Sequence, residues 1–123
     1  MVNMPRLARA FRNALKGLGF MIASQQNFRI QLTAAIGVIG CGLALHLNRF
    51  EFVALLAMIV LVFFTEIVNT AFEEMLDSIS LEFNHKFGYV KDIMAALVLV
   101  VATGSAAVGI IIFYPHILPL FTR

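Results

Sequence analysis

Residues 52–77 decide the fold, and they read FVALLAMIVLVFFTEIVNTAFEEMLD. The first part is apolar enough to cross a membrane, yet Glu66, Asn69, Glu73 and Asp77 follow at steps of three and four residues. At about 100° per residue, these four side chains fall within an arc of roughly 80° on one face of a helix. Ionisable groups are costly inside a membrane, so this polar stripe is the first candidate for a functional site.

Composition places the chain among membrane proteins. It is 61% hydrophobic and only 13% charged over 123 residues, with a mean hydropathy of +0.93. Three apolar stretches each approach the roughly 20 residues that cross a hydrocarbon core. We therefore predict an all-α membrane protein with a single domain, 1–123, and transmembrane helices at about 29–48, 51–78 and 91–114.

The segment at about 5–23 has a different pattern. Apolar residues recur every three or four positions, at Leu7, Phe11, Leu15, Leu18 and Ile22, and basic residues occupy the rest of the wheel, at Arg9, Arg12 and Lys16. This pattern predicts an amphipathic helix on the membrane surface, with its basic side chains near anionic head groups. Nothing in the chain resembles a module that reads bases, so no nucleic-acid partner is expected.

The basic residues also predict an orientation. Seven of the nine Lys and Arg residues lie before or at the start of the first span, or between the second span and the start of the third, and the other two are Arg49 and Arg123. Because cytoplasmic loops carry the excess of basic residues, we expect the N-terminus and the segment between spans two and three in the cytoplasm. The Glu73 and Asp77 end of the polar stripe would then face the compartment that holds ATP.

Acids and lysines at one membrane boundary favour phosphoryl transfer to a lipid hydroxyl. Mg²⁺ is often bound by one or two carboxylates together with nucleotide phosphates, so Glu73 with a partner could hold it. Lys91 could neutralise charge on the transferring phosphate. Glu66 lies deeper and could accept the proton from an alcohol whose hydrocarbon tail stays in the bilayer. The chain has no P-loop and no glycine-rich kinase loop.

These residues carry a family resemblance. The run EIVNTAFE at 66–73, followed by Asp77 and then Lys91-Asp92, resembles the signature of the small bacterial membrane kinases of diacylglycerol and undecaprenol. The likeness extends to Lys16-Gly17-Leu18 and to NFRI at 27–30, and it covers nearly the whole chain. It implies a homotrimer in the bacterial cell membrane, with three spans and a surface helix per subunit. It also implies ATP and Mg²⁺ as co-substrate and cofactor, and a lipid alcohol as the acceptor.

The resemblance also implies roles for individual residues. Glu66 would be the catalytic base, and Glu73 would ligate Mg²⁺. Asn69 would support the site beside the lipid substrate. The nucleotide contacts would be Arg6, Glu73, Asp77, Glu82, Phe83, Asn84, Lys91 and Asp92. Arg29, in the turn before the first span, would help bind lipid or nucleotide.

One departure from the family pattern concerns the metal. The family usually has a second metal-binding glutamate three residues before Phe28, and this chain has Gln25 there. An amide oxygen can ligate Mg²⁺ but brings no charge, so the site should hold the cation less tightly. The open outcomes are weaker metal dependence, replacement by Glu74 or Glu82, or a protein that no longer catalyses. We favour an active enzyme, because the rest of the set is present.

Two other functions stay open on the sequence alone. A small proton-coupled multidrug transporter would use one membrane-embedded glutamate, which Glu66 could be, but it would be expected to have four spans. A non-catalytic membrane protein of the kinase family is favoured only if Gln25 marks decay of the site. For the acceptor lipid, NFRI at 27–30 looks closer to the undecaprenol kinases than to the diacylglycerol kinases.

Overall fold

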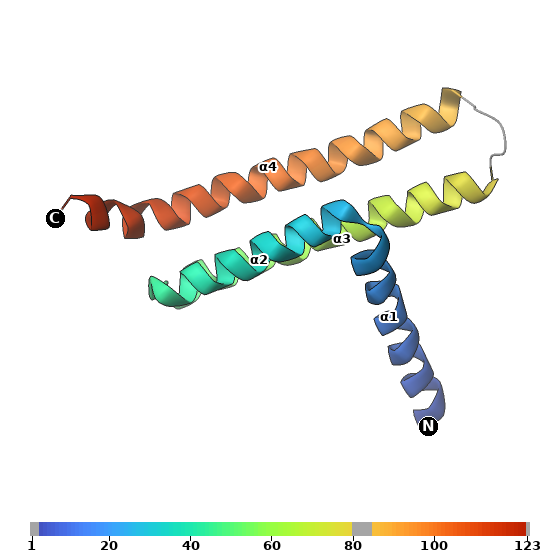
Figure 1. Cartoon of the computed structure of the whole chain (residues 1–123), viewed down its shortest axis with the longest axis horizontal. Helices are drawn as coiled ribbons and strands as arrows, with labels where there is room; N and C mark the ends of the chain where they lie inside the picture. Colours follow the sequence, from blue (N-terminus) through green and yellow to red (C-terminus); the bar gives the residue numbers. More distant parts are fainter. Residues whose placement is uncertain (1–2, 80–84, 123) are drawn as a thin grey trace.

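The computed structural model describes residues 3–79 and 85–122, which form four helices (Figure 1). They are α1 (Met4–Ser24), α2 (Gln26–Ala44), α3 (Arg49–Ile79) and α4 (His85–Phe121). Three helices are long and apolar enough to span a membrane, over Gln26–Ala44, Arg49–Ile79 and Lys86–Phe121. The prediction of an all-helical chain with three apolar spans is therefore confirmed.

Helix α1 projects away from the other three helices (Figure 1). It begins at an N-cap, Asn3, whose side-chain oxygen accepts a hydrogen bond from the Arg6 backbone N–H at 3.1 Å. Such a cap satisfies one of the backbone donors that the first helical turn leaves unpaired. Within α1 only Met21 is buried, so most of the helix has a surface that the described chain does not cover.

Helix α2 lies along α3, and two contacts fix their packing. Near the start of α2, Phe28 is buried and its ring lies 5.2 Å from that of Phe63 on α3, within the range of favourable aromatic pairs. At the other end, a Cβ on Gly42 would come within 3.3 Å of the Phe52 ring. Gly42 therefore permits the close approach of α2 to the start of α3.

A short turn joins α2 to α3. His46 adopts a positive φ of 53° there, and the Leu47 N–H donates to the Gly42 carbonyl at 3.1 Å. Asn48 then caps α3, because its Oδ1 accepts from the backbone N–H groups of Phe50 and Glu51, and the Asn48 N–H donates to Glu51 Oε2 at 2.9 Å. This reciprocal arrangement is a capping box, which here has Asn at the cap.

Helix α4 packs on α3 and is longer than the sequence predicted. It extends beyond 91–114 at both ends, and it continues through Pro115 and Pro119. A proline removes one backbone donor but already has a helical φ, so the turn can persist where other contacts hold it. Here His116 Nε2 lies 3.1 Å from both carboxylate oxygens of Glu51 on α3, and this contact ties the extra turns to the bundle.

Candidate active site

The polar stripe of α3 runs from the buried middle of the helix toward its exposed end. Glu66 is 2% exposed and Asn69 is 9% exposed. Glu73 is half-buried and Asp77 is exposed. The four residues therefore lie on one helix face in graded environments, with one carboxylate removed from solvent and another open to it.

Glu66 has a hydrogen-bond partner on α2. The side-chain amide of Gln31 donates from Nε2 to Glu66 Oε2 at 3.0 Å. Gln31 comes one turn after Phe28, whose ring contact with Phe63 sets α2 against this part of α3. The packing of two aromatic rings thus brings an amide donor to a buried carboxylate.

Asn69 connects the deep and shallow parts of the stripe. Its Nδ2 donates to Glu73 Oε1 at 3.4 Å, one helical turn further on. The amide nitrogen therefore faces Glu73, and the amide oxygen points elsewhere. This contact helps to hold the Glu73 carboxylate on the same face as Glu66.

Asp77 and Lys91 join α3 to α4 at the exposed end of the stripe. Lys91 Nζ lies 2.5 Å from Asp77 Oδ1, and the side chains are 39% and 66% exposed respectively. An ion pair so open to solvent contributes little to stability. What it does achieve is to hold a lysine from α4 beside the acids of α3.

Three buried side-chain atoms around Glu66 have no hydrogen-bond partner among the described residues. They are Gln31 Oε1, Asn69 Oδ1 and Thr70 Oγ1. Asn69 and Thr70 follow Glu66 by one helical turn, and Gln31 is bonded to it. Buried polar groups are nearly always paired in folded proteins, so a group of three unpaired atoms beside one carboxylate needs an explanation. We call Gln31, Glu66, Asn69 and Thr70 the Glu66 cluster.

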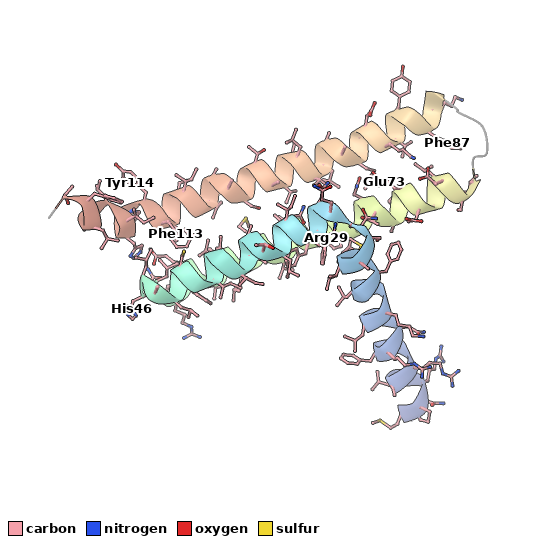
Figure 2. All side chains as sticks on the ribbon, in the orientation of Figure 1. Arg29, His46, Glu73, Phe87, Phe113 and Tyr114 are labelled. Atoms are coloured by element: carbon pink, nitrogen blue, oxygen red, sulfur yellow. The ribbon has the colours of Figure 1, made fainter. Side chains whose placement is uncertain are left out.

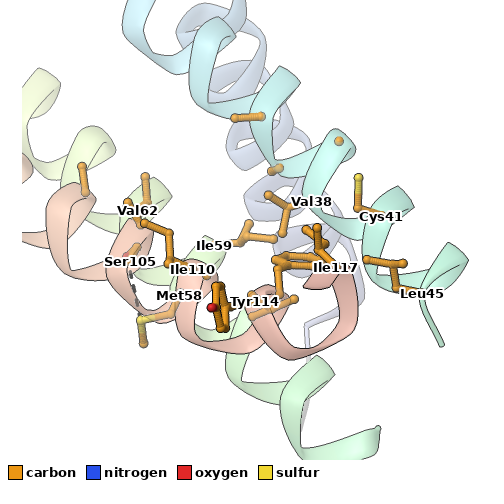
Figure 3. Close-up of a pocket in the computed structure, with 18 of the residues that line it drawn as sticks. Val38, Cys41, Leu45, Met58, Ile59, Val62, Ser105, Ile110, Tyr114 and Ile117 are labelled. Atoms are coloured by element: carbon orange, nitrogen blue, oxygen red, sulfur yellow. Dashed lines mark hydrogen bonds between the residues drawn. The ribbon is translucent and has the colours of Figure 1, made fainter. Parts of the chain in front are cut away.

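One residue of the Glu66 cluster, Gln31, lines one end of an apolar groove. The groove has a volume of about 960 Å³ and is lined by α2, α3 and α4, with Gln31 among its lining residues. Figure 3 shows side chains such as Val38, Ile59 and Ile110 arranged around it. A hydrocarbon environment thus reaches the side chain that holds Glu66.

The turn between α1 and α2 contains two predicted site residues. Gln25 separates the two helices and is half-buried, and its side chain makes no capping bond. Arg29 lies at the junction of the helices (Figure 2), where its guanidinium donates to the backbone carbonyls of Ile22 and Ala23 at 3.1 and 3.0 Å. Arg29 therefore caps the C-terminus of α1, and part of its hydrogen-bonding capacity is used in shaping this turn.

Other predicted residues are not gathered with the stripe. Arg6 lies in the first turn of α1, at the end of that helix that points away from the bundle (Figure 1). Asp92 is exposed on α4. Glu82, Phe83 and Asn84 lie outside the described residues. Within the described ranges, no group of three His, Cys, Asp or Glu side chains could hold a metal ion.

The available oxygens nevertheless fit a partial magnesium site. The Glu73 carboxylate is half-buried and partly accessible. Its oxygens are hard ligands of the kind that Mg²⁺ takes, and nucleotide phosphates commonly complete such sites. One protein carboxylate is therefore compatible with a cation that is delivered together with its nucleotide.

Comparison with known proteins decides the family. Residues 12–113 match the family model described as prokaryotic diacylglycerol kinase. The chain belongs to this family. The resemblance seen in residues 66–73 is thereby confirmed, and membership makes the chain a relative of lipid kinases.

Two curated members of the diacylglycerol kinase family are similar over most of the chain. A protein named diacylglycerol kinase, from Synechocystis, is 32% identical over 94% of this chain and 67% of its own length. A protein named undecaprenol kinase, from Bacillus subtilis, is 30% identical over 91% of both chains. The transporter alternative predicted four spans, and it is not supported by the three that the described residues contain.

Sequence reasoning missed Gln31 as a candidate site residue of this family member. A signal was available, because Gln31 is a strongly polar side chain at the start of the apolar stretch that forms α2, and such residues in membrane helices tend to face polar partners. Its partner could not be found from the sequence. The bond to Glu66 depends on how α2 packs against α3.

Proposed function

We propose that this chain transfers the γ-phosphate of ATP to the hydroxyl of a membrane lipid. One observation carries the proposal: Glu66 is a buried carboxylate, and three polar atoms of the other residues in its cluster are buried without a hydrogen-bond partner among the described residues, in a chain of a lipid kinase family. A structural glutamate would be expected to have a fully bonded environment. A buried carboxylate whose neighbours have unused hydrogen-bonding capacity is suited to binding a substrate that arrives through the bilayer.

In the proposed reaction, Glu66 is the general base. The lipid hydroxyl oxygen forms a bond to the γ-phosphorus, the bond from that phosphorus to the bridging oxygen of ADP breaks, and the hydroxyl proton passes to the Glu66 carboxylate. Glu66 is only 2% exposed, which matches an alcohol whose tail stays in the membrane. The groove beside Gln31 gives such a tail an apolar surface near the base.

The more exposed part of the stripe is proposed to bind the magnesium nucleotide. Glu73 would hold Mg²⁺, with Gln25 as a second, uncharged ligand, and the cation would neutralise charge on the β- and γ-phosphates. Lys91 is held beside Asp77, from where an ammonium group could contact a phosphate oxygen. As the family pattern implies, Arg6, Asp92 and residues 82–84 would also contact the nucleotide.

The same proposal covers topology and assembly. The chain would form one membrane domain, with the N-terminus and the α3–α4 connection in the cytoplasm, as the distribution of Lys and Arg favours. Helix α1 would lie on the membrane surface with its basic residues near anionic lipids. The subunits would assemble as a homotrimer, which the family pattern implies.

The acceptor is proposed to be a long-chain lipid alcohol, with undecaprenol favoured over diacylglycerol by the NFRI run at 27–30. Similar proteins carry both names, so the two alcohols should be tested side by side. Purified protein in mixed micelles is expected to transfer radiolabelled γ-phosphate to at least one of them in a Mg²⁺-dependent reaction. Lack of transfer to both lipids, with a known lipid kinase active in the same micelles, would refute the proposed function.

A non-catalytic role is the second candidate, because an amide replaces the usual glutamate at Gln25. If Gln25 occupies a metal-ligand position, the Gln25→Glu variant should reach half-maximal rate at a lower Mg²⁺ concentration than the wild type. Gln26→Glu, next to it on the exposed start of α2, is the matched control. An unchanged magnesium titration in Gln25→Glu would show that another residue holds the metal.

A further inference from the structure

The geometry points to Gln31 as a positioning residue that acts through Glu66: its amide holds one carboxylate oxygen of the base and thereby orients the other. This inference rests on the proposed function. It starts from the 3.0 Å bond from Gln31 Nε2 to Glu66 Oε2, which joins two transmembrane helices at the most deeply buried carboxylate of the described chain.

The direction of the Gln31 amide is fixed by chemistry. A carboxylate accepts hydrogen bonds, so the NH₂ group of Gln31 must face it, and the reversed amide would place two oxygens against each other. In the required orientation Gln31 Oε1 is buried without a partner. The Gln31 amide thus leaves its own oxygen without a hydrogen bond but keeps the bond to Glu66. The bond to Glu66 therefore determines how the amide is oriented.

The bond leaves the two oxygens of Glu66 in different situations. Oε2 is held by Gln31, and the described residues give Oε1 no hydrogen-bond donor. A buried polar group is costly without a hydrogen-bond partner, and Gln31 supplies that partner to Oε2. Gln31 thus fixes one oxygen of the base and leaves Oε1 to take the proton of the lipid hydroxyl.

The position of Gln31 also determines which kinetic parameter should change. Gln31 lines the end of the apolar groove and contacts Glu66, whereas the proposed nucleotide groups lie toward the far end of the stripe. Removing its donor should therefore weaken catalysis by Glu66 while leaving the binding of both substrates nearly intact. A loss in kcat with an unchanged KM is the pattern of an interaction that matters only in the transition state.

The test is a double-mutant cycle on Gln31 and Glu66 in the full chain. Gln31→Met keeps the length of the side chain and removes its donor, so kcat should fall by about tenfold or more, with KM for lipid and for ATP unchanged within about twofold. In the Glu66→Gln background, adding Gln31→Met should change the residual rate by less than about twofold. Gln26→Met, the same replacement at an exposed glutamine of α2, should keep the wild-type kcat.

Two results would overturn the inference about Gln31 in an active wild-type enzyme. One is a wild-type kcat in Gln31→Met. The other is an equal loss of rate in both backgrounds, which would mean that Gln31 acts on the fold and not through the base. Absence of activity in the wild type itself would instead overturn the proposed function, and the Gln31 inference with it.

Discussion

Two polar clusters tie α3 to its neighbours, and they differ in how fully their hydrogen bonds are satisfied. In the cluster of Asn48, Glu51 and His116, both Glu51 oxygens are paired, with His116 Nε2 at 3.1 Å from each and the Asn48 N–H at 2.9 Å from Oε2. In the Glu66 cluster, three buried atoms have no partner among the described residues. Complete pairing is what a structural contact needs, whereas incomplete pairing is expected where a substrate binds.

The distinction predicts that changes to the Glu66 cluster reduce activity and changes to the Glu51 cluster reduce stability. The largest effect is expected at Glu66. Glu66→Gln removes the base and should lower kcat by about 100-fold or more. Glu66→Asp keeps the carboxylate on a shorter side chain. Its kcat, measured from initial rates of lipid phosphorylation, should lie between that of Glu66→Gln and that of the wild type. Equal rates in the two variants would mean that the charge is not what matters.

A second large effect is expected at Glu73. Glu73→Gln removes the only charge that the proposed metal site has from α3, so the variant should be nearly inactive at Mg²⁺ concentrations that saturate the wild type. Glu74→Gln is the matched control, because Glu74 is the exposed neighbour. A magnesium titration of both variants checks this, and the assignment fails if Glu74→Gln is the more impaired.

A smaller effect is expected at the exposed pair of Asp77 and Lys91. Lys91→Met should raise KM for ATP by about tenfold, because it removes a charge from the proposed phosphate site. The midpoint of thermal inactivation should hardly change, because an ion pair so open to solvent contributes little to stability. A lower midpoint with an unchanged KM would assign the pair to stability and weaken the contrast between the two clusters.

The smallest effect on activity is expected at Asn48. Asn48→Ala removes the cap of α3 and should cost about 1 kcal/mol of stability, seen as a thermal-inactivation midpoint a few degrees lower. Turnover below that midpoint should equal that of the wild type. Thr33→Val is a suitable control, because among the described residues the Thr33 hydroxyl bonds only to the Arg29 carbonyl of its own helix. A loss of turnover in Asn48→Ala below its midpoint would contradict the assignment of this cluster to stability alone.

The sequence predicted what depends on local pattern. Hydropathy identified the three spans, and the helical period placed Glu66, Asn69, Glu73 and Asp77 on one face. These features depend only on residues close in sequence, so a single chain is enough to see them.

The sequence could not predict contacts that depend on how helices pack. The bond from Gln31 to Glu66 spans 35 positions, and that from His116 to Glu51 spans 65. His116 lies beyond the predicted third span, and the structure pairs it with Glu51 on α3. The third span was predicted to end at about residue 114 from the length of its apolar stretch, whereas α4 continues through Pro115 and Pro119, where His116 contacts α3.

The most direct test of the account compares Glu66→Gln with Glu51→Gln in one preparation, measuring lipid phosphorylation and the thermal-inactivation midpoint for each. Glu66→Gln is predicted to lose turnover by about 100-fold or more and to keep or raise the midpoint, because a buried charge is removed. Glu51→Gln is predicted to keep its turnover and to have a lower midpoint. The opposite pattern, with turnover lost in Glu51→Gln and retained in Glu66→Gln, would contradict the assignment of the reaction to the Glu66 cluster.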